Sequence, residues 1–140
     1  MQHKSQLTEK IRQPMALLLR YVKFRPDGGS NKAKIALMSD HDNDILRRAH
    51  AIRHEGIALE NDGLLNEART RYEEALSLYR VHSTADDLHY ANAVRYVAAI
   101  YGRLGLTREA KELWHEALSR YEECGIKEGV EEASRHLRDG

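Results

Sequence analysis

The sequence predicts an all-α protein built mainly from two stacked helix–turn–helix hairpins, and three observations lead to this prediction. First, residues 67–79 (EARTRYEEALSLY) recur 42 positions later as residues 109–121 (EAKELWHEALSRY), with seven of the thirteen positions identical. Second, the apolar residues in both copies recur at intervals of three and four, which places them on one face of an α-helix. Third, the 140-residue chain contains few of the β-branched and aromatic clusters that are typical of strands.

The front of the chain, residues 1–43, shows no repeat, and we expect it to form a helix and a loop that pack on the repeats. We place the helix at 13–24, because its apolar residues share a helical stripe. These residues are Met15, Leu18, Leu19 and Val22. A short strand over the same residues is the alternative. The sequence PDGG at 26–29 is a strong stop signal and should end either element.

The first hairpin is expected over about 44–84. Asn43 or Asp44 is the expected N-cap of its first helix, and Gly63 supplies the left-handed turn to its second helix. The second helix carries a buried stripe, which consists of Ala68, Tyr72, Ala75, Leu76 and Tyr79. Ser83 or Thr84 is then expected to cap the helix that follows.

The second hairpin is expected over about 85–126, with Gly105 in its turn. Its buried stripe consists of Ala110, Leu113, Trp114, Ala117, Leu118 and Tyr121. Ala75 and Ala117 should lie where two helices approach closely, because alanine leaves room for a neighbouring backbone. A last helix over about 127–139 matches the start of the second hairpin at the same offset and has a charged face. It either caps an open stack or belongs to a longer array.

Taken together, the small residues, glycine turns and aromatic residues resemble the tetratricopeptide repeat family. The matching positions are Gly56, Leu59, Gly63, Ala68, Tyr72 and Ala75, then Ala98, Tyr101, Gly105, Ala110, Trp114 and Ala117. The resemblance covers about residues 44–124. Two features depart from the common pattern: Glu55 stands where a large apolar residue is usual, and the repeat has 42 residues rather than about 34. The long repeat is similar to the variant found in kinesin light chains and in many bacterial regulators.

This resemblance implies a right-handed α–α superhelix, with the repeat domain at 44–140, and a non-catalytic role as a protein-interaction module or scaffold. In this family the first helices of successive hairpins line a concave groove that takes a peptide or a partner helix. The side chains that we expect in this groove are His50, Arg53, Ile57, Asn92, Arg95, Tyr96 and Arg103.

Arg53 and Arg95 lie one repeat apart, and we expect both to face the groove and neither to belong to the packing stripe. Two arginines facing one groove suit the capture of carboxylates, so the predicted partner is an acidic peptide. Arg53, Asn92 and Arg95 also partly resemble a tetratricopeptide carboxylate clamp, although Tyr96 stands where a clamp often carries asparagine. The alternative is that the arginines pair with groove acids such as Glu60 and form a solvated charged face.

Self-association is the second function that the sequence allows, as a homodimer through exposed end helices. An enzyme or a metal-binding protein is a more distant alternative, because no set of catalytic residues is recognisable. His50 and His54 have a spacing that can bind a metal, but Arg53 lies between them. The alternating acids at 40–44 lack the glycine and the final glutamate of a calcium loop. No cofactor or metal is therefore expected.

Composition and charge restrict the other classes of function. Residues 1–34 hold eight Lys and Arg against two acids, whereas residues 35–140 hold fourteen against twenty, so a uniformly basic nucleic-acid binder is not expected. The basic front either packs on its own acidic remainder or serves as an arm for an acidic partner. The longest apolar run, at 15–19, is far too short to span a membrane. The polar start lacks the apolar core of a secretion signal, and the single cysteine, Cys124, excludes an intramolecular disulfide, so we expect a cytoplasmic protein.

Overall fold

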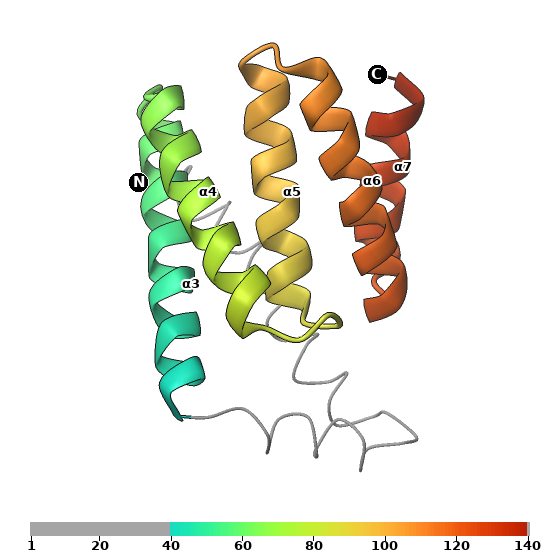
Figure 1. Ribbon diagram of the computed structural model, residues 1–140. Helices are drawn as coiled ribbons and strands as arrows, with labels where there is room; N and C mark the ends of the chain where they lie inside the picture. Colours follow the sequence, from blue (N-terminus) through green and yellow to red (C-terminus); the bar gives the residue numbers. More distant parts are fainter. Residues whose placement is uncertain (1–39, 140) are drawn as a thin grey trace.

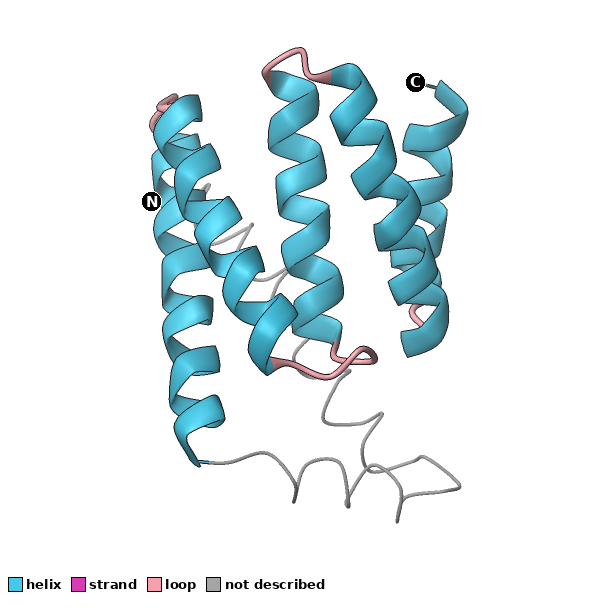
Figure 2. Ribbon diagram, viewed as in Figure 1, coloured by secondary structure: helices cyan, strands magenta, loops and turns pink. Residues whose placement is uncertain are grey.

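The computed structural model describes residues 40–139, which form five α-helices joined by short loops (Figures 1 and 2). The helices are α3 (Asp40–Asn61), α4 (Leu65–His82), α5 (Leu88–Arg103), α6 (Thr107–Cys124) and α7 (Lys127–Asp139). The all-α class is confirmed for this range, in which no strand occurs. None of these five helices is long and apolar enough to cross a lipid bilayer. The helix expected at 13–24 and the turn at 26–29 lie outside the described residues.

Consecutive helices run antiparallel, and the main packing contacts are those between helices adjacent in the chain. Figure 1 shows α4 in front of α3 and α6 in front of α7, with α5 between the two pairs. The two predicted hairpins are α3–α4 and α5–α6, and α7 is the predicted last helix.

Three glycines end helices in the left-handed conformation, with φ values between 72° and 82°. At each one, the residue that follows the glycine donates its backbone N–H to the carbonyl of the residue five positions earlier. This bond is the hallmark of the Schellman motif, which satisfies carbonyls that the helix end leaves free. The glycines are Gly63, Gly105 and Gly125, so the two predicted turns are confirmed and a third turn of the same kind precedes α7.

Two predicted N-caps are wrong. α3 already begins at Asp40, so Asn43 and Asp44 lie inside the helix. The cap of α5 is Asp87, whose carboxylate accepts the backbone N–H of His89 at 2.9 Å. Ser83 instead donates its hydroxyl to that same carboxylate, because the loop runs several residues further than expected before α5 starts. Aspartate and serine are both good caps, so the length of the loop decides between them.

The core repeats with the same offset as the sequence. The predicted stripe of α4 is buried at all five positions, and the stripe of α6 is buried except at Leu113 and Leu118, which are partly exposed. One alanine on each of α3, α5 and α7 has no exposed surface, and these three lie 42 residues apart: Ala49, Ala91 and Ala133. The fully buried alanine of α7 therefore lies at the position that corresponds, by the 42-residue offset, to buried alanines of α3 and α5.

The closest approach in the first hairpin is that of an aromatic ring to a bare helix backbone. A Cβ added to Gly56 would lie 2.6 Å from Cε1 of Tyr72, too close for any side chain. The ring cannot move aside, because it stacks on Tyr96 with 5.2 Å between ring centroids and donates its hydroxyl to Glu60 at 2.7 Å. Gly129 on α7 receives the ring of Tyr121 in the same way.

Enlarging the alanines of the stripes tests the helix packing. Ala75→Leu and Ala117→Leu should each lower the free energy of unfolding by about 1–3 kcal/mol, because both sites are fully buried and leave no room for the added atoms. The matched control is Ala51→Leu on the exposed face of α3, which should change stability by less than about 0.5 kcal/mol. Chemical denaturation gives these values, and equal stabilities of all three variants would contradict the packing.

Two glycine substitutions should have opposite signs. Gly56→Ala should destabilise by about 1–3 kcal/mol because the methyl group meets the immobile Tyr72 ring. Gly102→Ala, in α5 with open space around it, should stabilise by up to about 1 kcal/mol through helix propensity. Thermal unfolding of both variants measures the difference, and a stabilising Gly56→Ala would show that the rings are not fixed as described.

Candidate binding site

Arg53 is the centre of a buried polar cluster, although we expected it outside the packing stripe. Its side chain has no exposed surface, so that expectation is wrong. The reason is helical register: Arg53 lies four residues after Ala49 and three before Gly56, on the face of α3 that packs against its neighbours. We call the residues in contact with it the Arg53 cluster; it consists of Arg53, His50, Tyr79, His89 and Tyr96.

The guanidinium is held by hydrogen bonds to neutral groups. Nη1 donates to the backbone carbonyl of His89 at 3.2 Å, and Nη2 donates to Nδ1 of His50 at 2.9 Å. The guanidinium carbon also lies 5.8 Å from the ring centroids of both Tyr79 and Tyr96. Within residues 40–139, no carboxylate forms an ion pair with Arg53.

The two imidazoles beside Arg53 are neutral. Burial, followed by the charge of Arg53, lowers the pKa of both His50 and His89 to about 3. Since Nδ1 of His50 accepts from Arg53, its proton resides on Nε2, which donates to Nε2 of His54 at 3.1 Å. The cluster thus keeps the full positive charge of Arg53.

Two polar atoms of the cluster, Nε of Arg53 and the hydroxyl of Tyr79, are buried and have no hydrogen-bond partner among the described residues. Native proteins pair nearly all such atoms. Both atoms can donate a hydrogen bond, and an incoming anion would accept from them. Nearby on α5, Asn92 accepts the hydroxyl of Tyr121 at 2.5 Å, while its Nδ2 has no partner in this range. On α5, the spacing of His89, Asn92 and Tyr96 places the three residues on one face.

The other predicted groove arginines have intramolecular carboxylates. Arg95 binds Glu132 of α7 with both ends of its guanidinium, at 2.6 Å from Nε to Oε1 and 3.1 Å from Nη2 to Oε2. Arg103 binds Glu60 of α3 at 2.6 Å. The alternative that Arg53 and Arg95 pair with acids therefore holds for Arg95, whose partner is Glu132 and not Glu60, and does not hold for Arg53 among residues 40–139.

Of the seven predicted side chains, the structure brings three together in the cluster, His50, Arg53 and Tyr96, whereas Asn92 pairs with Tyr121 of α6. Arg95 lies beside it, with its guanidinium carbon 5.4 Å from the ring centroid of Tyr96. Ile57 belongs to the hydrophobic core instead of a binding surface. Sequence reasoning missed His89, although its spacing to Asn92 and Tyr96 was a usable signal, and it assigned Tyr79 a purely apolar role.

No arrangement in the described part of the chain suits metal or thiol chemistry. Among residues 40–139, no three His, Cys, Asp or Glu side chains converge as metal ligands. Burial, together with Asp87 and Asp86, raises the pKa of the Cys124 thiol to about 12, which leaves it protonated and inert.

Comparisons of this chain with protein-family models, with curated proteins and with solved structures gave no match. The function therefore has to be inferred from the Arg53 cluster and the surfaces around it.

The neutral histidines predict a loss of stability in acid. His50 and His89 stay neutral in the folded chain down to a pKa of about 3, but they become charged in the unfolded chain below about pH 6.5. Their contribution is complete above pH 6.5 and is lost as the pH falls from there toward 3. Between pH 7 and pH 5, unfolding should become easier by about 1–3 kcal/mol through these two groups, after allowing for solvent screening at the partly exposed His50.

Denaturation of the double variant His50→Gln/His89→Gln at both pH values checks this. The variant should lose about 1–3 kcal/mol of the pH dependence, whereas His115→Gln, on the exposed surface of α6, should retain all of it. An unchanged dependence in the double variant would show that the imidazoles are not held neutral.

Proposed function

We propose that the chain is a non-catalytic protein-interaction module of the tetratricopeptide type, and that it binds a carboxylate-bearing peptide at the Arg53 cluster. One observation carries this proposal: among residues 40–139 no carboxylate forms an ion pair with the fully buried guanidinium of Arg53, and its Nε and the neighbouring Tyr79 hydroxyl have no hydrogen-bond partner there. The support for the repeat type is the 42-residue periodicity of the buried alanines, the glycine turns and the close approach of Tyr72 to Gly56. A right-handed superhelix is part of the proposal.

A buried cation without a direct ion pair is costly even though the charge of Asp87 lies near enough to interact with it, and an incoming carboxylate would recover part of the cost. The effective penalty of burying an ion is several kcal/mol, and a hydrogen bond to a charged group contributes about 1.5–3 kcal/mol. A carboxylate next to Nε of Arg53 would accept from that nitrogen and also from the hydroxyl of Tyr79, whose ring lies beside the guanidinium. The donors of the cluster are therefore better suited to binding an anion than to packing alone.

A carboxylate ligand would reach Arg53 by passing His50 and His89. His50 and His89 are only partly buried, unlike Arg53 and Asn92, so they form the border between the guanidinium and solvent. A carboxylate that replaces one imidazole as the acceptor of Nη2 gains a charge-assisted bond in exchange for a neutral one. Arg95 is not needed for this step, because Glu132 already neutralises it.

Self-association has less support. Among residues 40–139, the only exposed large hydrophobic side chains are Leu64 and Val81, and two isolated side chains do not make an apolar interface. A concentration-dependent molecular mass in light scattering would favour the homodimer over peptide binding.

Replacing Arg53 with an uncharged residue tests whether its charge is needed for peptide binding or for folding. Arg53→Met should leave the stability unchanged or raise it, since an apolar side chain of similar length removes a buried ion. It should weaken binding of an acidic heptapeptide with a free C-terminus at least tenfold, as measured by calorimetry against the full chain.

Two controls are needed to interpret the effect of Arg53→Met on peptide binding. Arg103→Met removes an arginine that already has a carboxylate partner, and it should leave peptide affinity within twofold. The same peptide with Asn and Gln in place of its acids, and an amidated end, should not bind the unmodified protein. If Arg53→Met destabilises the fold strongly and leaves affinity intact, the guanidinium serves packing and not recognition.

A further inference from the structure

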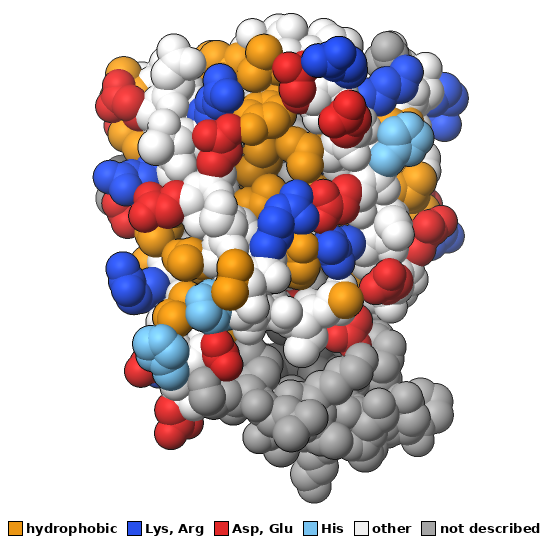
Figure 3. Space-filling model, in the orientation of Figure 1, with side chains coloured by type: hydrophobic (Ala, Val, Ile, Leu, Met, Phe, Trp, Pro, Cys, Tyr) orange, Lys and Arg blue, Asp and Glu red, His pale blue; other side chains and the backbone are white. Residues whose placement is uncertain are grey.

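A second surface, formed by the other helices of the hairpins, has the opposite charge. α4 and α6 are separated by a groove of about 390 Å³ whose base is formed by α5. We call it the α4–α6 groove. Figure 3 shows hydrophobic side chains between α4 and α6 in the upper half of this face, with acidic side chains on both sides of them.

The floor of the α4–α6 groove is apolar. Leu76 of α4 and Val97 of α5 lie at its base, and Leu113 of α6 and Tyr101 of α5 are partly exposed beside them. Leu113 was predicted to belong to the buried stripe of its helix, but the structure leaves part of its side chain open to this groove. Such a floor favours an occupant with an apolar face.

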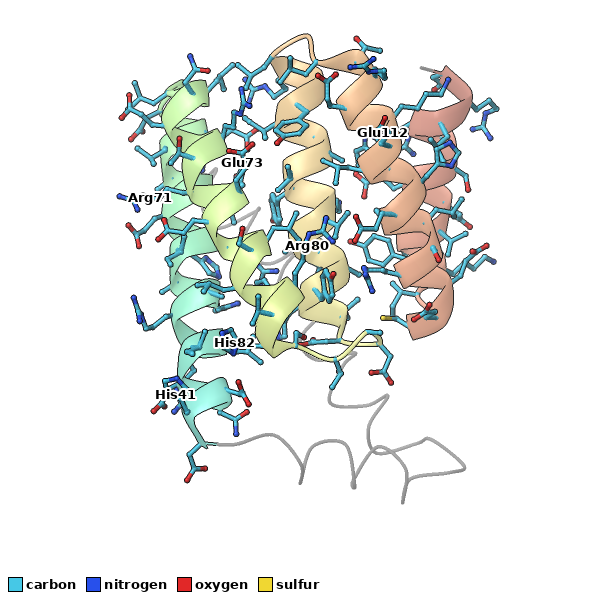
Figure 4. The ribbon with its side chains drawn as sticks, viewed as in Figure 1. His41, Arg71, Glu73, Arg80, His82 and Glu112 are labelled. Atoms are coloured by element: carbon cyan, nitrogen blue, oxygen red, sulfur yellow. The ribbon has the colours of Figure 1, made fainter. Side chains whose placement is uncertain are left out.

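The rim of the groove is acidic. Glu73 on α4 and Glu112 on α6 lie on opposite sides in Figure 4, and Glu109 lies one turn before Glu112. Glu73 is partly satisfied by Arg69, at 3.1 Å, and by the hydroxyl of Tyr101. Glu109 and Glu112 have no ion pair or hydrogen bond among the described residues.

Arg80 is the one cation among the residues that line the groove, and it does not neutralise the acidic rim. Both Nη atoms of Arg80 bind the carboxylate of Glu116, at 2.7 and 2.9 Å, and one of them also donates to Tyr90. Residues 40–139 as a whole hold fourteen Lys and Arg against twenty Asp and Glu, so the net charge of the helical part adds to the local negative field.

We propose that the α4–α6 groove is a docking surface for a basic amphipathic helix of a partner protein. The apolar face of that helix would cover Leu113 and Tyr101, and its Lys or Arg side chains would meet Glu109 and Glu112. These two carboxylates are three residues apart on α6, which matches cations placed three or four residues apart on a second helix. Recognition of this kind, a helix laid into a groove between two others, relies on apolar anchors flanked by complementary charges. This partner differs from the acidic peptide of the Arg53 cluster in both site and charge.

The probe is a 16-residue helical model peptide with a leucine stripe and arginines beside it, titrated into the full chain and followed by fluorescence anisotropy. It should bind with a micromolar Kd, and Glu109→Gln/Glu112→Gln should weaken binding at least tenfold. The matched control is Glu128→Gln/Glu131→Gln on α7: these two glutamates are exposed, whereas Glu109 is partly exposed, and they are likewise three residues apart and begin in the first turn of a helix. This control changes the net charge equally and should leave the Kd within twofold.

Three results would overturn the proposal. Equal weakening by both double variants would mean that only the net charge attracts the peptide. An unchanged Kd in the Glu109/Glu112 variant would mean that the peptide binds elsewhere. Tenfold tighter binding by the full-length variant Arg20→Gln/Lys23→Gln/Arg25→Gln, at a salt concentration that screens the change in net charge, would mean that the basic front of the chain itself occupies the groove. The variant Leu113→Gln separates the contribution of the apolar floor to binding from that of the acidic rim. It should also weaken binding, but it should not alter the salt dependence of the Kd.

Discussion

The approach of the Tyr72 ring to the bare backbone of Gly56 is the constraint on which the rest of the first hairpin depends. Only a residue without a side chain lets α4 lie this close to α3. The ring is then held on its other side by Tyr96 of α5, so one aromatic residue links three helices. Its hydroxyl orients Glu60, which in turn binds Arg103 at the far end of α5. A similar contact, of Tyr121 on Gly129, holds α7 against α6, whereas the second hairpin has Ala98 and Trp114 at the positions of Gly56 and Tyr72.

This packing also creates the polar cluster. Once α3, α4 and α5 are held at this distance, the side chain at position 53 is fully buried, and its guanidinium lies 5.8 Å from the ring centroids of both Tyr79 and Tyr96. Cation–π contact and hydrogen bonds to neutral imidazoles stabilise the charge without cancelling it. Burying a charge in this way costs stability. In a recognition site, part of that cost would be recovered when a bound anion pairs with the guanidinium.

The two proposed surfaces divide the chain by charge. The cluster on α3 and α5 concentrates one uncompensated cation in a desolvated place, where electrostatic interactions are strong. The α4–α6 groove instead spreads carboxylates along an open rim, where each is screened and several must act together. A repeat protein can keep such sites apart, because its two sets of helices are connected mainly through the contacts between neighbours.

The sequence by itself determined the helices, the glycine turns and the stripe of α4, because each of these depends on residues close together in the chain. A left-handed glycine or a three-and-four spacing has the same meaning wherever the helix packs. Only the tertiary structure decided that Arg53 is buried, that Arg95 belongs to Glu132 and that Leu113 opens to a groove. The contacts responsible link residues that are far apart in the chain. Arg53 donates to the backbone carbonyl of His89, 36 residues away, and Arg95 binds Glu132, 37 residues away. The periodicity identified which face of α3 packs, but a charged residue on that face could be assigned to core or groove only when the neighbouring helices were in place.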